Sequence, residues 1–452
     1  MCVCPGRRPK TTREERPARA HNTIANLFFE REAGGERALL VSVALEGEAD
    51  PEPEEFLELA RAAGAEVLAL ETAKRRQPDR RTYLGSGRAE ALRDQVQALE
   101  AELVIFDQDL SPAQERNLEA LVQARVLSRT GLILDIFAQR ARTHEGKLQV
   151  ELAQLEHLST RLVRGWTHLD RQKGGIGMRG AGETQLELDQ RMVRTRIGQV
   201  KRRLADVRAQ RAQSRRARQR RRIPSVALVG YTNSGKSTLF NALADASVLA
   251  ADQLFATLDP TLRRLAIAGL GPAVLADTVG FVRRLPHRLV EAFKATLEEV
   301  SEADVLLLVI DIADPAWEDK RAEVLAVLEE LGASAVPRIE VHNKIDLTED
   351  SQPRCQPRPG FSPALRVSAA ARLGFDLIHE ALATELGRAL GGAVRGQGAL
   401  APEAGRLRAE LHQQGWVEAE VMGEDGEITL SLRLPRDVLP RLEAEGLRFI
   451  PA

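Results

Sequence analysis

Hydrophobic and polar residues in the first third of the chain change repeatedly between short apolar runs and stretches with a helical period. Residues 1–35 are polar, rich in Arg and Pro and without a sustained period, so they are expected to form a disordered tail. Strands and helices then alternate, with strands predicted at Ala38–Leu45, Glu66–Leu70 and Leu103–Phe106 and helices at Pro53–Ala63, Ala89–Glu102 and Pro112–Gln123. This alternation predicts a parallel sheet, and hence an N-terminal α/β domain over residues 36–143.

From about Gly146 the apolar residues follow the period of one long helix, and a glycine-rich break separates it from a second helix. Six glycines between Arg164 and Gln185 interrupt the pattern, because each costs about 1 kcal/mol in a helix relative to alanine. The second helix has apolar residues spaced four and three apart, as in a coiled-coil seam, at Val193, Ile197, Val200, Leu204 and Val207. Residues 144–222 are therefore predicted to form an antiparallel helical hairpin with a Gly-rich tip, whose second helix, Leu186–Arg215, would extend about 45 Å.

Beyond Arg222 the alternation of strands and helices resumes with an apolar strand at Ser225–Val229. Residues 223–390 are predicted to form a second α/β domain with a mostly parallel sheet. The Gly and Ala residues that follow indicate a linker over residues 391–400. Residues 401–452 have the pattern of a small C-terminal α+β domain, with elements expected at Pro402–Gln413, Val417–Met422, Ile428–Leu434, Arg436–Glu445 and Leu447–Ile450.

Charged residues are distributed very unevenly, although the whole chain is nearly neutral, with 64 Lys and Arg against 65 Asp and Glu. From Arg191 to Arg222 there are 14 Lys or Arg and one acid, Asp206, which gives this part of the hairpin a net charge of +13. A solvated helix face would normally pair its cations with acids four residues away, and those acids are missing here. The hairpin is therefore predicted to bind a polyanion, and RNA is the expected partner.

Hydropathy and cysteine content argue against a membrane-spanning protein, an exported protein and a disulfide-rich protein. The longest purely aliphatic run, Val305–Ile310, is too short to cross a bilayer, so no membrane span is predicted. The start of the chain lacks the apolar stretch of an export signal, which favours a cytoplasmic location, with peripheral membrane attachment left open. A monomer is expected. Cys2, Cys4 and Cys355 are too few for a disulfide framework, and Cys2 and Cys4 lack further clustered metal ligands.

A phosphate-binding loop is predicted where the strand Val226–Val229 ends and a helix begins. The sequence fits G-x-x-x-x-G-K-[ST] with Gly230, Tyr231, Thr232, Asn233, Ser234, Gly235, Lys236 and Ser237, followed by Thr238 in the helix. The glycines allow backbone N–H groups to surround phosphate oxygens, and the helix N-terminus adds positive potential. Lys236 is expected to reach the β- and γ-phosphates, and the Ser237 hydroxyl is expected to bind Mg²⁺.

The residues that would contact the base favour guanine over adenine. About one hundred residues after the phosphate-binding loop, the motif N-K-x-D consists of Asn343, Lys344, Ile345 and Asp346. The Asp346 carboxylate can accept hydrogen bonds from guanine N1–H and N2–H₂, whereas it would face the lone pair of adenine N1. A loop that would border the guanine consists of Ser368, Ala369 and Ala370. GTP is therefore the expected substrate.

Two further segments would respond to the γ-phosphate. The motif D-x-x-G consists of Asp277, Thr278, Val279 and Gly280, in which Asp277 would hold Mg²⁺ through water and the Gly280 N–H would meet the γ-phosphate. Switch I consists of Phe255, Ala256, Thr257, Leu258 and Asp259 and would supply Thr257 for contact with Mg²⁺ and the γ-phosphate. Thr261, two residues beyond this segment, is the alternative for the same contact.

Phe281 follows the D-x-x-G motif at a position where many GTPases carry a glutamine that orients the attacking water. Because its side chain cannot hydrogen-bond, intrinsic hydrolysis is predicted to be slow. In an alternative interpretation, Phe281 only packs and another group orients the water. In both cases a partner surface is expected to complete or reshape the site.

Together these residues resemble the HflX family of ribosome-associated GTPases. The most specific segment is Lys173–Glu187 in the hairpin tip, and the phosphate-binding loop, Phe255–Asp259 and Asp277–Phe281 are also similar. The resemblance covers residues 36–390. It implies a P-loop GTPase domain and favours Thr257 over Thr261. The expected catalytic residues are Lys236, Thr257 and Gly280, and those serving Mg²⁺ are Ser237, Thr257 and Asp277.

The resemblance also implies binding to the large ribosomal subunit through the hairpin Arg164–Arg222, with its tip toward the peptidyl-transferase region. It further implies subunit-stimulated GTP hydrolysis and splitting of stalled or idle ribosomes, which composition and spacing cannot show. Two alternatives stay open. One is an RNA remodeller whose N-terminal domain uses ATP, supported only by the G-x-G at Gly85–Gly87. The other is an anti-association factor that uses nucleotide only as an affinity switch.

Overall fold

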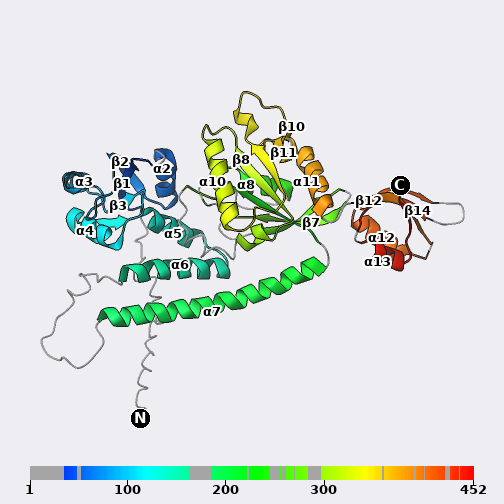
Figure 1. Ribbon diagram of the computed structural model, residues 1–452, viewed down its shortest axis with the longest axis horizontal. Coiled ribbons are helices and arrows are strands. Elements are labelled where there is room, and N and C mark those ends of the chain that lie inside the picture. Colours follow the sequence, from blue (N-terminus) through cyan, green and yellow to red (C-terminus); the bar gives the residue numbers. More distant parts are fainter. Residues whose placement is uncertain are drawn as a thin grey trace, which may run out of the picture. The chain divides into compact units, whose positions relative to one another are not determined.

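In the computed structural model, the described part of the chain contains three sheets with their helices and a pair of long helices (Figure 1). The structure describes residues 35–47, 52–162, 185–220, 223–244, 255, 261–268, 270–283, 297–358, 361–389, 393–401, 403–422, 428–436 and 438–451. Gly35–Ala452 form one compact unit. The expected tail, apart from Gly35, lies outside the described residues. In these ranges, no helix has the length and hydropathy that a membrane span requires.

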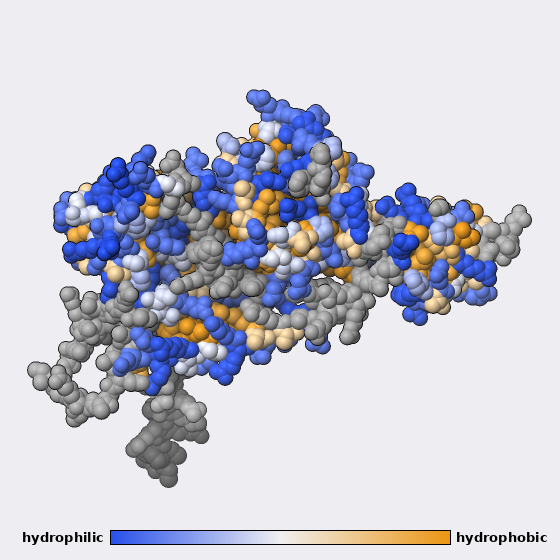
Figure 2. Space-filling model, in the orientation of Figure 1, coloured by the Kyte–Doolittle hydropathy of each residue, from blue (hydrophilic) through white to orange (hydrophobic). Residues whose placement is uncertain are grey.

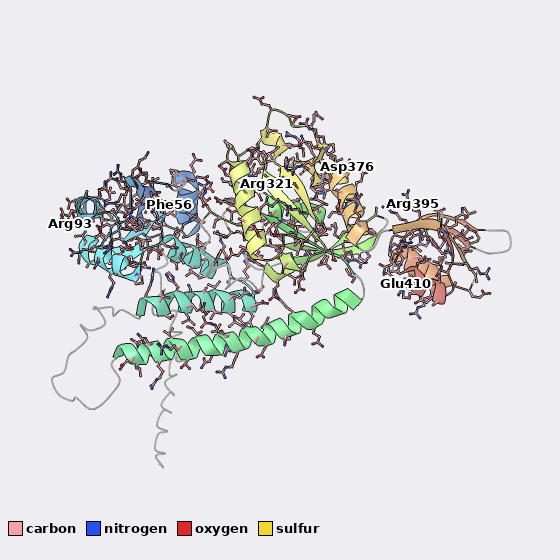
Figure 3. All side chains as sticks on the ribbon, viewed as in Figure 1. Phe56, Arg93, Arg321, Asp376, Arg395 and Glu410 are labelled. Atoms are coloured by element: carbon pink, nitrogen blue, oxygen red, sulfur yellow. The ribbon has the colours of Figure 1, made fainter. Side chains whose placement is uncertain are left out.

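The N-terminal domain is a parallel sheet of order β2-β1-β3-β4 with helices against both faces. Ala38 and Leu40 of β1 pack with Phe56 of α2, which Figure 3 labels. Leu39 and Val41 point into a separate cluster on the other face. The elements are β1 (Arg37–Leu45), α2 (Pro53–Ala62), β2 (Glu66–Arg75), α3 (Ser86–Ala98), β3 (Leu103–Phe106), α4 (Pro112–Val122), β4 (Arg125–Leu127) and α5 (Arg129–Arg140). The expected N-terminal α/β fold is confirmed.

The helical hairpin consists of α6 (His144–Leu162) and α7 (Gln185–Arg220), which lie side by side in Figure 1. Figure 2 shows apolar residues along the line where the two helices meet, and Val193, Val200 and Leu204 of α7 are fully buried there. The helix α7 has 36 residues and extends about 54 Å, longer than predicted. The expected Gly-rich tip lies outside the described residues.

Ion pairs between α6 and α7 fix their antiparallel arrangement. Glu145, near the start of α6, pairs with Arg211 far along α7 at 2.7 Å. Glu156, later in α6, pairs with Lys201, earlier in α7 than Arg211, at 2.8 Å, as two antiparallel helices require. Glu151 also pairs with Arg196, at 2.6 Å. Acids of α6 therefore neutralise some of the α7 cations. The net charge of α7 alone does not reveal this pairing, because the acids belong to the other helix.

The second α/β domain has a seven-stranded sheet of order β10-β11-β9-β8-β5-β7-β6. The five inner strands are parallel, and β6 and β10 are antiparallel edges. The carboxyl ends of β5, β7, β8 and β9 lie along one edge, where ligands of such sheets bind. The elements are β5 (Ser225–Gly230), α8 (Lys236–Leu243), β6 (Thr261–Ile267), β7 (Gly271–Asp277), β8 (Val305–Asp311), α10 (Trp317–Glu330), β9 (Arg338–Asn343), η2 (Ile345–Leu347), β10 (Arg354–Arg358), β11 (Phe361–Arg366) and α11 (Phe375–Ala389).

The C-terminal domain is an antiparallel sheet of order β13-β14-β12-β15 with two short helices. Its elements are β12 (Ala393–Leu400), α12 (Gly405–Gln413), β13 (Val417–Met422), β14 (Ile428–Pro435), α13 (Leu439–Ala444) and β15 (Arg448–Pro451). The expected α+β character is confirmed.

The predicted linker at residues 391–400 is wrong for its larger part, because β12 is a central strand of this sheet. Its glycines serve close packing. A Cβ atom at Gly396 would collide with the Ile450 carbonyl oxygen, and one at Gly398 would come within 2.5 Å of the Leu432 side chain. Glycine-rich composition alone does not distinguish such a strand from a flexible linker.

Candidate nucleotide-binding site

The phosphate-binding loop leaves β5 at Gly230 and enters α8 at Lys236. Gly230 and Gly235 have φ angles of 154° and 91°, which residues with side chains rarely adopt. A Cβ atom at Gly230 would collide with the Val309 carbonyl oxygen, and one at Gly235 would collide with the Asn343 side-chain nitrogen. The loop therefore requires glycine at both positions that the motif specifies.

Lys236 is a buried cation at the start of α8. Its ammonium group donates a hydrogen bond to the Tyr231 carbonyl oxygen at 2.6 Å. Burial lowers the pKa of Lys236 to about 8, although the nearby Asp277 carboxylate opposes this shift. Phosphate oxygens would replace the solvation that burial removes, so the loop is suited to an anionic ligand.

Ser237 and Asp277 come together from α8 and the end of β7. The Ser237 hydroxyl donates to a carboxylate oxygen of Asp277 at 2.8 Å, and Asp277 is fully buried. Hydroxyl and carboxylate oxygens are the hard ligands that Mg²⁺ prefers, so this pair fits the expected metal. The Asp277 backbone also pairs with Thr261 across the β6–β7 ladder.

Switch I is described at Phe255 alone, so Ala256, Thr257, Leu258 and Asp259 lie outside the described residues. The choice between Thr257 and Thr261 stays a prediction. Phe255 is buried, and its ring meets Phe137 of α5 edge-on, with centroids 4.7 Å apart and an interplanar angle of 81°. This contact joins switch I to the N-terminal domain.

Asn343 connects the two ends of the site through its side-chain amide. Its nitrogen donates to the Ser234 carbonyl oxygen at 2.8 Å, and its oxygen accepts from the Ala369 N–H at 2.9 Å. The predicted base loop Ser368–Ala370 is thereby held beside the phosphate-binding loop. Asp346, in η2, is exposed, so its carboxylate is accessible to a ligand.

Lys344, between Asn343 and Asp346 in the motif, adopts a left-handed backbone conformation with φ of 64°. Its ammonium group pairs with the Asp311 carboxylate at the end of β8, at 2.7 Å. The structure therefore brings the ends of β5, β7, β8 and β9 together at one site, as the order of the motifs predicts.

Switch II, the segment that begins with Asp277–Phe281, starts against the phosphate-binding loop. The Phe281 N–H donates to the Gly230 carbonyl oxygen at 3.1 Å, and the Thr232 N–H donates to the Phe281 carbonyl oxygen at 2.7 Å. A Cβ atom at Gly280 would approach the Lys236 ammonium nitrogen to 3.0 Å, so glycine permits this closeness. The Phe281 side chain is 2% exposed and packs in the core, in line with the packing interpretation.

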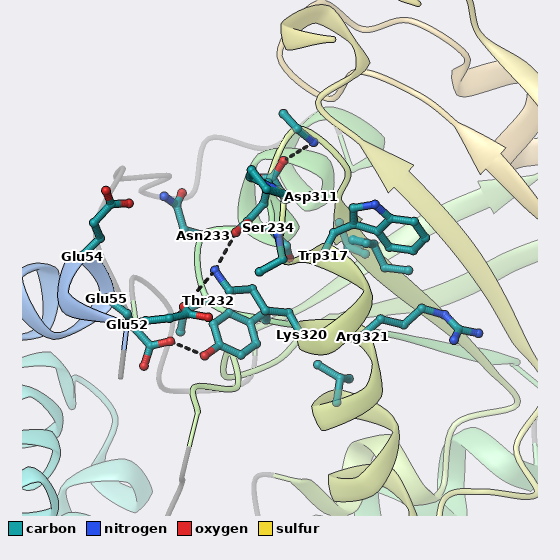
Figure 4. A pocket seen from close by; sticks show the side chains of 18 of the residues that line it. Glu52, Glu54, Glu55, Thr232, Asn233, Ser234, Asp311, Trp317, Lys320 and Arg321 are labelled. Carbon is teal, nitrogen blue, oxygen red and sulfur yellow. Dashed lines mark hydrogen bonds and ion pairs between the residues drawn. The ribbon is translucent and has the colours of Figure 1, made fainter. Parts of the chain in front are cut away.

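A cavity of about 650 Å³ lies between α2, the phosphate-binding loop and α10 (Figure 4). Glu52, which precedes α2, and Glu55 of α2 line one side, and Thr232 and Asn233 line the other. Sequence reasoning missed these carboxylates, because neither belongs to one of the nucleotide-binding motifs. Glu55 lies on the buried side of α2 beside Phe56 and Leu59, and no local sequence pattern indicates a buried glutamate there.

The chain is similar to known GTPases over most of its length. Consecutive regions match the families described as GTP-binding GTPase N-terminal (residues 51–138), GTP-binding GTPase Middle Region (residues 140–218) and 50S ribosome-binding GTPase (residues 225–344). A solved GTP-binding protein from Sulfolobus solfataricus in complex with GDP is 23% identical, with a TM-score of 0.41, and the match covers 78% of this chain and 99% of that one.

Two curated relatives are both named GTPase HflX. The protein of Escherichia coli (strain K12) is 52% identical over 410 residues, which cover 90% of this chain and 96% of the relative. The protein of Magnetococcus marinus is 46% identical over 394 residues, which cover 87% and 90% of the two chains. Identity at this level across the nucleotide domain, the hairpin and the N-terminal domain establishes both the family and GTP hydrolysis as its reaction. The chain belongs to the HflX family of GTPases.

Proposed function

We propose that the protein binds the large ribosomal subunit through its hairpin and splits stalled or idle ribosomes into subunits. In this proposal, the subunit stimulates hydrolysis of GTP to GDP and phosphate. The proposal is carried by the arrangement of charge on α7. Arg196, Lys201 and Arg211 pair with α6, whereas Arg194, Arg202 and Arg203 are exposed. One set stabilises the hairpin, and the other is available to RNA phosphates.

The hairpin directly precedes the nucleotide domain, because α7 ends at Arg220 and β5 begins at Ser225. The match of residues 225–344 to a family described as 50S ribosome-binding GTPase supports the same partner. A nucleotide-dependent change around β5 would therefore act close to the base of the proposed RNA-binding arm.

In the proposed site, Lys236 and the Gly280 N–H hold the phosphates, and Asp346 selects guanine. Ser237 and Asp277, with Thr257, would hold Mg²⁺, which neutralises charge that develops on the phosphates when it is bound. Phe281 supplies no hydrogen bond to the attacking water. We therefore propose that the ribosome supplies or orients the group that hydrogen-bonds to this water. Such a contribution would account for the proposed stimulation of GTP hydrolysis by the large subunit.

Sedimentation of purified ribosomes through a sucrose gradient tests the proposal. We expect GTP and a non-hydrolysable analogue to produce separate subunits with the protein on the large one, and GDP to produce none. Splitting with the analogue would assign hydrolysis to release of the protein. Binding to free large subunits without loss of intact ribosomes would contradict splitting and support the anti-association alternative.

Charge removal on the hairpin is expected to weaken ribosome binding. With Arg194, Arg202 and Arg203 all changed to Gln, the slope of log affinity against log salt should fall by about 0.7 to 0.9 for each phosphate that the variant no longer neutralises. Changing Arg76, Arg80 and Arg81 of the N-terminal domain to Gln removes the same charge and is the matched control. Equal loss of binding by both triple variants, measured by co-sedimentation at several salt concentrations, would show that overall charge and not the hairpin determines binding.

A further inference from the structure

A buried polar network connects the N-terminal domain to the nucleotide site. At its centre is Arg129, the first residue of α5, whose side chain is 6% exposed. Its guanidinium group pairs with the carboxylates of Glu55 and Asp107, the latter at 2.5 Å. It also donates to the backbone carbonyl oxygen of Arg283 at 2.9 Å. One cation of the N-terminal domain thus binds the start of switch II directly.

The Tyr231 hydroxyl group continues the network into the phosphate-binding loop. It donates to the second carboxylate oxygen of Glu55 and accepts from the Arg283 N–H at 2.6 Å. Burial and the Glu55 carboxylate raise the pKa of Tyr231, so the group stays protonated and can donate. Both backbone polar groups of Arg283 are therefore held by this network.

Tyr231 also contacts the reaction's own machinery through its backbone. Its carbonyl oxygen accepts from the Lys236 ammonium group at 2.6 Å. Arg283 follows Gly280 by three residues. Its side chain pairs with Glu52, the residue before α2, at 3.0 Å and with Glu323 of α10 at 2.9 Å. The same tyrosine thus touches the phosphate-binding lysine with its backbone and switch II with its side chain.

Such a network has few alternative arrangements, because Arg129, Glu55, Asp107 and Tyr231 are buried polar groups that need their partners. Rotation of the Tyr231 ring would leave the Glu55 carboxylate without that donor in an enclosed space. Movement of switch II away from the loop would remove the Arg283 carbonyl from Arg129. The network therefore restricts where the Gly280 N–H lies relative to Lys236.

We propose that Tyr231, Glu55 and Arg129 are positioning residues for GTP hydrolysis, which place switch II against the phosphate-binding loop from the N-terminal domain. The N-terminal domain is then part of the hydrolytic apparatus, although it contacts no reacting atom. A displacement of about 1 Å can reduce the rate of a reaction up to a hundredfold, so loss of one positioning hydrogen bond has a measurable effect.

Tyr231→Phe tests the proposal, because it removes one hydroxyl and keeps the ring. Single-turnover hydrolysis by the full chain without ribosomes should slow about tenfold, while the Kd for GDP and the KM for GTP stay within about twofold. The matched control is Tyr83→Phe, since Tyr83 is the chain's other tyrosine and is equally buried, at 7% exposure. An unchanged rate in Tyr231→Phe, or parallel changes in rate, Kd and melting temperature, would overturn the proposal.

A double-mutant cycle tests whether Tyr231 acts through Glu55. Glu55→Leu keeps a similar volume and leaves Arg129 paired with Asp107 alone, so no buried carboxylate loses its partner. If the two residues act through one hydrogen bond, the double variant should be no slower than Glu55→Leu. Multiplicative effects of the two changes on the hydrolysis rate would show that they act independently and would contradict the proposed route.

Discussion

Replacing Lys236 with Ala should lower GTP hydrolysis by about a hundredfold to a thousandfold, the usual loss when one preorganised donor to a reacting group is removed. Lys236 is buried, and its pKa is lowered to about 8 by burial, so it has lost solvation that phosphate oxygens can restore. The side chain is held at the head of the loop by the Tyr231 carbonyl oxygen. Phosphate release from saturating GTP gives the measurement.

Lys201→Ala is the matched control, because Lys201 is a half-exposed lysine on the hairpin paired with Glu156. It should leave hydrolysis by the isolated protein unchanged. ATP hydrolysis should be measured with the same two variants. ATP turnover that survives Lys236→Ala would favour the alternative in which the N-terminal domain, with Gly85–Gly87 at the start of α3, uses ATP.

Changing Asp346 to Asn should weaken GDP binding by at least a hundredfold, which corresponds to about 3 kcal/mol. The carboxylate can accept from both guanine donors, whereas the amide would present its own NH₂ group to one of them. Asp346 is exposed in η2, so its carboxylate is accessible to the base. Preference for GDP over ADP should fall by a similar factor.

Titration calorimetry with GDP and ADP measures both quantities. Glu349→Gln is the matched control, because Glu349 is an exposed acid three residues further along the chain and should leave both affinities unchanged. A protein that binds GDP normally with Asn at position 346 would refute the assigned base contact and, with it, the specificity for guanine.

Local motifs in the sequence were enough to predict the strand–loop–helix geometry of the candidate site. The loop residues lie consecutively between a strand and a helix. The positions of Gly230, Gly235 and Lys236 therefore follow from the local sequence alone. Asn343 and Asp277 are distant in sequence, but each follows an apolar strand of the same parallel sheet. The rule that such strand ends meet at one edge was enough to bring them together.

The network around Arg129 could not be predicted in this way. Glu55 and Arg129 join the site only because α2 and α5 pack next to the phosphate-binding loop and switch II. Neither has a spacing or a motif that indicates such a contact, and ion pairs on α-helices are common on surfaces. The length of α7 was underestimated for a related reason. Its apolar seam ends near Val207, and the Arg-rich turns to Arg220 continue the helix without any hydrophobic period.

The side chain of Asn343 connects the predicted base loop to the predicted phosphate-binding loop, so we expect binding of the base and binding of the phosphates to be interdependent. Its amide is bonded on one side to Ser234 and on the other to Ala369. If one part of a nucleotide orders the loop at Ser234 or the loop at Ala369, the other loop loses less conformational entropy when the rest of the nucleotide binds. By linkage the effect is reciprocal: a guanosine moiety should tighten the hold on pyrophosphate by the same factor as pyrophosphate tightens the hold on guanosine.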